Sequence, residues 1–265
     1  MTLIIGILCE NGVVLAADSQ ATMGNAGAGH TAAQRTAHKL SIHHDKMIVG
    51  FAGFVGLSQR LKPLIEGACK DQLQLRGAKP ETMASNIREK IVPVCKAELE
   101  MSQAVYNLTH NQGVVGYALP NALIAMPLQD QPCLLQILET CAVEYASADL
   151  PFVAIGSGQR DAEPFLAFIR DTLWPAKKLP SVADAQFSAF WTLKHVIEIN
   201  PSGGIGGSIQ IVSLLKNGGW KAVEMTPGER LVHENAVEGA GRALQAWRAD
   251  FGQTPTGPAP TAPPV

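Results

Sequence analysis

The chain has 265 residues, of which 46% are hydrophobic and 17% charged, and its formal net charge is -2 at pH 7. This composition can build a sizeable core and excludes disorder over most of the length. The near-neutral charge, with no basic run, argues against a nucleic-acid partner or an anionic membrane surface. We expect one domain over residues 2–252, followed by a Pro-rich disordered tail at 253–265.

The cysteines and the N-terminal sequence indicate the compartment. Five cysteines without a C-x-x-C pair predict neither a disulfide framework nor a zinc site, which fits a reducing environment. The apolar stretch after Met1 is too short to span a bilayer, and it lacks the basic start of a secretory signal. We therefore expect a cytoplasmic protein with no membrane segment.

The first half of the sequence predicts antiparallel strands followed by two helices. Leu3 to Cys9 and Val13 to Ala17 are apolar runs joined by Asn11-Gly12, a strong hairpin signal. The small residues of 24–34 predict a loop, after which a second hairpin turns at residues 43–45. Apolar residues then recur at helical spacing. The expected elements after the loop are strands at 39–42 and 47–51 and helices at 57–73 and 80–101.

The second half predicts the same alternation of strands and helices. Ser181-x-x-Asp184 resembles a capping box and predicts the start of a helix. The expected elements are strands at 121–126, 133–138, 143–146 and 151–155, helices after Gly158 and after Ser181, strands at 207–215 and 219–225, and a helix near 234–250. Short turns between strands and helices in pairs predict an α+β fold, a four-layer αββα sandwich of two antiparallel sheets flanked by helix pairs.

Thr2 is a candidate nucleophile. We expect Met1 to be removed, because a small residue follows it, and Thr2 would then carry both a hydroxyl and a free α-amine. An α-amine titrates near ~7.7 to 8.0 and can therefore accept the hydroxyl proton at neutral pH without a histidine. Many proteins have threonine as their second residue, so Thr2 alone does not support a conclusion about function.

The residues around Thr2 resemble the catalytic β-subunits of proteasomes, and especially the bacterial proteasome-related peptidases that pair with an ATPase ring. The resemblance is dense over about the first 60 residues and returns in two later glycine-rich motifs. The matching segments are Thr2 to Gly6, Asn11 to Gly24, Lys39-Leu40, Gly50-Phe51-Ala52-Gly53, Ala154-Ile155-Gly156-Ser157-Gly158 and Ser202-Gly203-Gly204.

The resemblance implies a catalytic role for five residues besides Thr2. Asp18 would hold Lys39, and the Lys39 ammonium would favour the neutral Thr2 amine and the developing alkoxide. Gly53 would supply the oxyanion-hole N–H, and Ser157 and Ser202 would support the proton relay. Taken singly, Asp18 is equally typical of a turn cap, Lys39 of an edge strand, and Gly53 or Ser157 of an ordinary turn.

The chain departs from the family pattern near Ser202. The family has an aspartate three residues before this serine, where this chain has Ile199, with Glu198 one position earlier. Either Glu198 substitutes for that aspartate, or the support of the site lacks an acid.

The resemblance also implies a substrate pocket and an assembly. Ala21, Thr22, Ala37, Phe51 and Val55 match its lining positions. The apolar character of Ala21, Ala37, Phe51 and Val55 predicts an apolar side chain before the scissile bond. We expect an N-terminal threonine endopeptidase without cofactor or metal, acting on polypeptides inside two stacked rings of six or seven copies, with an ATP-dependent unfoldase as a candidate partner. A small-molecule amidase of the same superfamily and a catalytically silent ring subunit are the alternatives.

Overall fold

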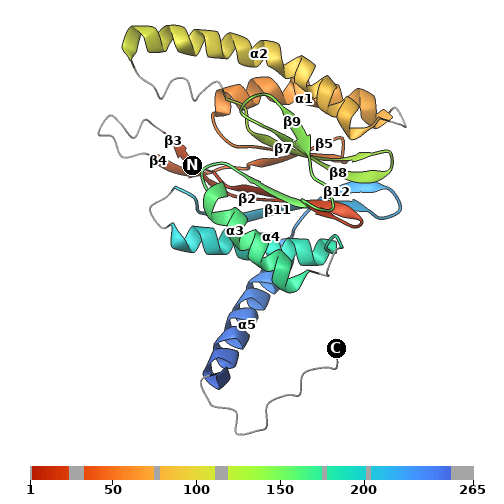
Figure 1. Ribbon diagram of the computed structural model, residues 1–265, viewed down its shortest axis with the longest axis vertical. Helices are drawn as coiled ribbons and strands as arrows, with labels where there is room; N and C mark the ends of the chain where they lie inside the picture. The colour runs from red at the N-terminus through yellow and green to blue at the C-terminus, as the bar shows by residue number, and fades with distance from the viewer. Residues whose placement is uncertain are drawn as a thin grey trace, which may run out of the picture.

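Two stacked antiparallel sheets, each covered on its outer face by a pair of helices, form the body of the protein (Figure 1). A computed structural model describes residues 2–23, 33–74, 78–110, 119–174, 178–200 and 204–251, and the expected Pro-rich tail lies outside them. At positions 22–23, 33–34 and 71–74 the description covers the main chain alone. The four-layer αββα sandwich predicted from the sequence is confirmed.

The first sheet has five strands in the order β10-β1-β2-β11-β12. Its strands are β1 Ile4–Cys9, β2 Gly12–Asp18, β10 Phe152–Ile155, β11 Ile209–Lys216 and β12 Trp220–Glu224. Strands β1 and β2 form the Asn11-Gly12 hairpin that the sequence predicts, with Ile4 opposite Ala17 and Cys9 opposite Gly12.

Strands β1 and β2 are wholly buried because they are covered on both faces. Successive side chains point to opposite faces of a strand. Accordingly, Ile5 and Val14 pack toward the helices of the outer layer, whereas Ile4 and Leu15 pack toward the second sheet. This double burial explains why both strands read as continuous apolar runs rather than as alternating patterns.

The second sheet follows the order β5-β6-β7-β8-β9. Its strands are β5 Leu40–His43, β6 Met47–Phe51, β7 Ala122–Leu128, β8 Gln131–Ile137 and β9 Val143–Tyr145. Helices α1 Val55–Gln74 and α2 Pro80–Thr109 cover its outer face (Figure 1). Pro80 occupies the first turn of α2, where its missing N–H costs no hydrogen bond. Helix α2 ends eight residues beyond the predicted boundary at 101.

Helices α3 Gln159–Leu173 and α4 Val182–Ile199 cover the first sheet. The Ser181 hydroxyl accepts a hydrogen bond from the Asp184 N–H at 3.1 Å, so the predicted cap is confirmed. Helix α5 Pro227–Phe251 packs against α4 near its start, where the His233 ring stacks on Phe190, and then extends away from the body (Figure 1).

A small hairpin was not predicted from the sequence. Strands β3 Gln20–Met23 and β4 Ala33–Thr36 pair antiparallel, with Gln20 opposite Thr36. The expected loop covers part of β4, and its residues 24–32 lie outside the described ranges. Among the helices that the structure describes, none has both the length and the apolar character required to cross a bilayer.

Candidate active site

Asp18 is the centre of a hydrogen-bond cluster at the end of β2. Its side chain is fully buried. One carboxylate oxygen, Oδ1, accepts from the Leu3 N–H at 2.9 Å and from Lys39 Nζ at 2.7 Å. The other, Oδ2, accepts from the Gln20 N–H at 3.2 Å and the Gly206 N–H at 3.1 Å. Asp18 therefore links the N-terminal segment, Lys39 and the segment before β11 that carries Gly206, and its role exceeds that of a turn cap.

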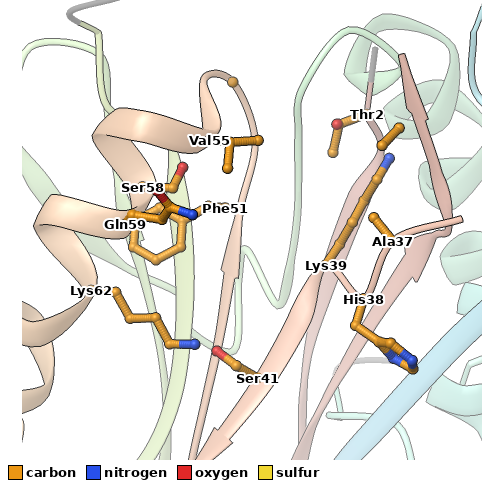
Figure 2. A pocket seen from close by; sticks show the side chains of 12 residues that line it. Thr2, Ala37, His38, Lys39, Ser41, Phe51, Val55, Ser58, Gln59 and Lys62 are labelled. Carbon is orange, nitrogen blue, oxygen red and sulfur yellow. The ribbon is translucent and has the colours of Figure 1, made fainter. Parts of the chain in front are cut away.

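Lys39 forms a buried ion pair with Asp18. Only 8% of the Lys39 side chain is exposed. Burial lowers the pKa of the Lys39 ammonium, and the hydrogen bond and charge of Asp18 oppose this shift. Figure 2 shows the Lys39 side chain extended along a pocket, with its nitrogen at the end where Thr2 lies.

Gln210 positions the main chain that carries Lys39. Its Oε1 accepts from the Lys39 N–H at 3.0 Å, and its Nε2 donates to the Ala37 carbonyl at 2.8 Å. Gln210 could not be predicted from the sequence, because a glutamine on a strand of mixed character gives no signal of its own. Gln210 is separated from Lys39 by 171 positions and from Ala37 by 173. Its hydrogen bonds to these residues therefore form only when the sheets assemble.

Thr2 lies directly before β1 and is held by the loop that follows β10. Its main-chain nitrogen donates to Ser157 Oγ at 3.1 Å, and its carbonyl accepts from the Gly158 N–H at 3.3 Å. Gly156 has a φ of +93°, and a Cβ added there would lie 2.3 Å from the Thr2 carbonyl oxygen. Glycine is therefore required at position 156 both by its backbone conformation and by the closeness of Thr2.

A pocket of about 290 Å³ opens beside Thr2 and Lys39. Four of the five residues predicted to bind substrate line it: Ala21, Ala37, Phe51 and Val55. For Thr22 the structure describes only the main chain, in β3. The sequence did not point to the polar residues that also line the pocket as substrate-binding residues; they are His38, Ser41, Ser58, Gln59 and Lys62.

Gly53, the predicted oxyanion donor, also lines the pocket. It lies between β6 and α1 with a φ of +112°, a conformation that side chains rarely adopt. The turn at Gly53 therefore also forms part of the pocket wall. At this position the Gly53 N–H can face the carbonyl group of a bound substrate.

The region before Ser202 differs from the family pattern. Ser202 itself lies outside the described residues, which resume at Gly204. Glu198 is exposed on the last turn of α4, and Ile199 is 50% exposed. Instead, Asn200 Nδ2 donates to Asp161 Oδ2 at 2.9 Å, tying the end of α4 to the first turn of α3. This contact was missed because the two residues lie 39 positions apart.

The sequence comparisons cover the part of the site that comes from residues 2–168, which excludes Gly206 and Gln210. A family model described as a proteasome subunit matches residues 2–168. The proteasome subunit beta of Methanocella paludicola is 39% identical over 69 residues, which are 26% of this chain and 31% of that protein. The match thus spans about a third of the length of this curated relative.

Solved structures share the fold over nearly the whole chain. Anbu (ancestral beta-subunit) from Yersinia bercovieri has a TM-score of 0.62 at 17% identity, covering 96% of this chain and 100% of that one. A Gly-1 mutant of Anbu from Hyphomicrobium sp. strain MC1 has a TM-score of 0.65 at 16% identity, covering 96% and 99%. The Anbu complex from Pseudomonas aeruginosa, solved as a helical assembly, has a TM-score of 0.64 at 17% identity, covering 96% and 98%.

Proposed function

This chain belongs to the proteasome subunit family, and on that premise we propose that it is a threonine endopeptidase of the β-subunit type. Its nucleophile is Thr2, exposed by removal of Met1, and residues 2–252 form the peptidase domain. The substrates are polypeptides, and the chemistry uses no cofactor or metal.

The observation that carries this proposal is the Asp18–Lys39 ion pair at the Thr2 end of a pocket. Lys39 Nζ lies 2.7 Å from a fully buried carboxylate, and the Thr2 nitrogen lies 3.1 Å from the Ser157 hydroxyl. Structural ion pairs also occur away from active sites. Here, however, the pair, the candidate nucleophile, Ser157 and an open pocket meet at one place, which supports a catalytic role.

The proposed reaction has two steps. In the first, Thr2 Oγ attacks the peptide carbonyl carbon while the Thr2 α-amine takes the hydroxyl proton, and the Gly53 N–H stabilises the oxyanion. The C–N bond then breaks, the proton passes to the leaving amine, and an acyl ester remains on Thr2. In the second step, the same amine takes a proton from water, which attacks the ester, releases the carboxyl product and restores the hydroxyl.

The role of Lys39 follows from its charge and position. An ammonium near the Thr2 amine disfavours a second positive charge there, so it lowers the pKa of that amine and keeps it available as a base near neutral pH. Asp18 holds the ammonium in place, and Ser157 and Ser202 assist proton transfer. Asp18, whose four donors come from separate segments, acts as the positioning residue.

We infer that copies of the chain self-assemble, as two stacked rings of six or seven in the cytoplasm. Exposed apolar side chains at the C-terminal ends of two helices support self-association: Leu108 on α2 is 84% exposed and Phe251 on α5 is 77% exposed. The related Anbu from P. aeruginosa was solved as a helical assembly. An ATP-dependent unfoldase is the partner that would feed folded substrates into such a chamber.

Intact mass and peptide hydrolysis test the proposal together. We expect the purified protein to lack Met1 and to cleave fluorogenic peptides. Thr2→Ala should abolish cleavage, while Thr2→Ser, which keeps a hydroxyl, should retain it. A retained Met1 on the whole population, or equal cleavage by Thr2→Ala, would contradict the proposed nucleophile.

The alternatives give different results in the same experiments. A small-molecule amidase would ignore peptides but still depend on Thr2, and a silent subunit would show no activity that depends on Thr2. Light scattering tests the assembly: 12 or 14 copies of the 28.1 kDa chain give about 340 or 390 kDa. A monomer or dimer at micromolar concentration would exclude the ring.

A further inference from the structure

The end of the pocket opposite Thr2 carries a lysine that the family resemblance did not point to. Lys62, on the second turn of α1, lines the same pocket as Thr2 and Lys39. Figure 2 shows Thr2 at one end of the pocket and Lys62 and Ser41, which also line it, toward the other. A substrate side chain that enters beside Thr2 therefore extends toward Lys62.

The charges along the pocket are positive. Among the described residues that line it there are two lysines and one histidine, and no aspartate or glutamate. The Lys39 charge is balanced by Asp18. Lys62, by contrast, forms no ion pair with any residue that the structure describes.

The nearest turn of α1 does offer a carboxylate, but it faces other partners. Glu66 Oε2 lies 3.3 Å from His43 Nδ1, and Glu66 Oε1 lies 3.1 Å from His44 Nε2. Burial lowers the pKa of His43; the Glu66 charge opposes this shift, and the Lys62 charge adds to it. Lys62 therefore stands close to His43 without sharing its acidic partner.

Apolar side chains form part of the pocket wall. Phe51, Val55 and Ala21 line the pocket, as do the uncharged Ser58 and Gln59. At the far end, Ser41 Oγ lies 3.0 Å from His43 Nε2. That hydroxyl donates to the Val49 carbonyl at 3.2 Å, so the group at this end that complements an anion is the Lys62 ammonium. A pocket with partly apolar walls and a cation at its end complements a side chain with an aliphatic stem and an anionic tip.

We propose that this pocket selects an acidic side chain, glutamate above its neutral analogue glutamine, at the residue preceding the scissile bond, with Lys62 as the specificity-determining residue. The inference rests on the proposed peptidase function and names its substrate class. The wall residues alone predicted an apolar preference; the charge at the end of the pocket leads to a different one.

The test compares two fluorogenic peptides, acetyl-trialanyl substrates ending in Glu or in Gln, which differ only in charge. A charge-assisted hydrogen bond at a partly exposed site corresponds to about a 10-fold preference, and we expect this ratio of kcat/KM in the natural protein. Lys62→Gln should bring the ratio close to one, and Lys62→Glu should favour Gln. Lys70→Gln, an exposed lysine of the same helix outside the pocket, should keep the natural ratio.

The outcomes separate this inference from the proposed function. Equal cleavage of the two peptides by the natural protein, or an unchanged ratio in Lys62→Gln, overturns the role of Lys62 while leaving the peptidase intact. If neither peptide is cleaved, the peptidase proposal fails, and fluorescein-labelled peptide amides ending in Glu or Gln test the pocket by anisotropy. Tighter binding of the Glu peptide that Lys62→Gln removes supports the inference; equal binding, or no binding, overturns it.

Discussion

The two ends of the pocket are built in different ways. At the Thr2 end, Asp18 accepts four hydrogen bonds from separate segments, and the Lys39 side chain is 8% exposed. At the far end, Lys62 is half-buried on a surface helix and has no ion pair within the described residues. The catalytic groups at the Thr2 end are held by contacts within the protein, whereas we propose that the Lys62 charge gains its partner when a substrate binds.

This difference has a physical origin in the elements that supply each end. The Thr2 end is supplied by β1 and β2, which are buried on both faces. The far end comes from α1, whose outer side faces solvent. A reaction centre requires groups held in one geometry, and a specificity site requires a charge left unsatisfied until the substrate arrives. The predictions below test this contrast, beginning with the largest effect.

The strongest test substitutes the two lysines with arginine. Lys39→Arg and Lys39→Ala should each reduce kcat/KM by at least about 1000-fold, because a planar guanidinium cannot replace a compact ammonium against buried Asp18. Lys62→Arg should keep the preference for Glu over Gln, since that end requires only a cation. Steady-state kinetics with the paired peptides measures both; near-normal turnover by Lys39→Arg would remove Lys39 from the mechanism.

The second test compares two glycines. A Cβ at Gly156 would lie 2.3 Å from the Thr2 carbonyl oxygen, at a φ of +93°, so Gly156→Ala should lower turnover by at least about 100-fold and stability by about 2 kcal/mol or more. A Cβ at Gly56, at the start of α1, meets no atom within 4 Å. Gly56→Ala should raise stability by about 0.5 kcal/mol. Chemical denaturation measures the stability of both variants, and steady-state kinetics measures their turnover. Equal tolerance of the two substitutions would contradict the proposed difference between the two ends of the pocket.

The third test uses pH. Because burial lowers the pKa of Lys39, its ammonium is lost at a lower pH than that of an ordinary lysine. The activity that depends on this charge should therefore fall as pH rises through the lowered pKa, about 10-fold per pH unit beyond it. A pH profile of kcat/KM should show an alkaline limb below 10.5, the ordinary value. A profile that stays flat to pH 10.5 would contradict this role of the Lys39 ammonium.

The fourth test removes Gln210, which holds the main chain on either side of His38. Gln210→Met keeps the size of the side chain and loses both hydrogen bonds to Ala37 and Lys39. We expect turnover to fall by about 10-fold, the scale of an indirect positioning contact. Gln136→Met, a change on β8 away from the pocket, is the matched control. Equal rates for the two variants would show that Lys39 needs no such support.

The smallest effect concerns the end of α4. Asn200→Ala loses the bond to Asp161 and should slow turnover by about 5-fold, because the α3 start that Asp161 occupies follows directly on Ser157. Glu198, exposed to solvent, should tolerate Glu198→Gln with less than about a 2-fold change. A larger loss in Glu198→Gln would restore it as the replacement for the acid missing at Ile199.

Much of the fold could be predicted because its signals are local. The continuous apolar runs of β1 and β2, the Asn11-Gly12 turn and the Ser181 cap each depend on neighbours within a few residues. The β3–β4 hairpin could not be predicted, since its stability comes from contacts such as the Ala37 N–H to the Ser19 carbonyl. Spaced motifs pointed to the candidate catalytic residues. Of these, Thr2, Lys39 and Gly53 line the pocket, Asp18 pairs with Lys39 and Ser157 contacts Thr2, while Ser202 lies outside the described residues.

What only the tertiary structure decided is which polar groups share a space. Nothing in the sequence distinguishes Lys62, Gln210, Asp161 or Asn200 from ordinary charged and polar residues. Their partners are distant in the chain, so no periodicity or spacing records them. Local sequence fixes the elements through backbone preferences and apolar patterning, whereas the charge of a pocket depends on side chains from several elements converging within a few ångströms, and packing alone determines that.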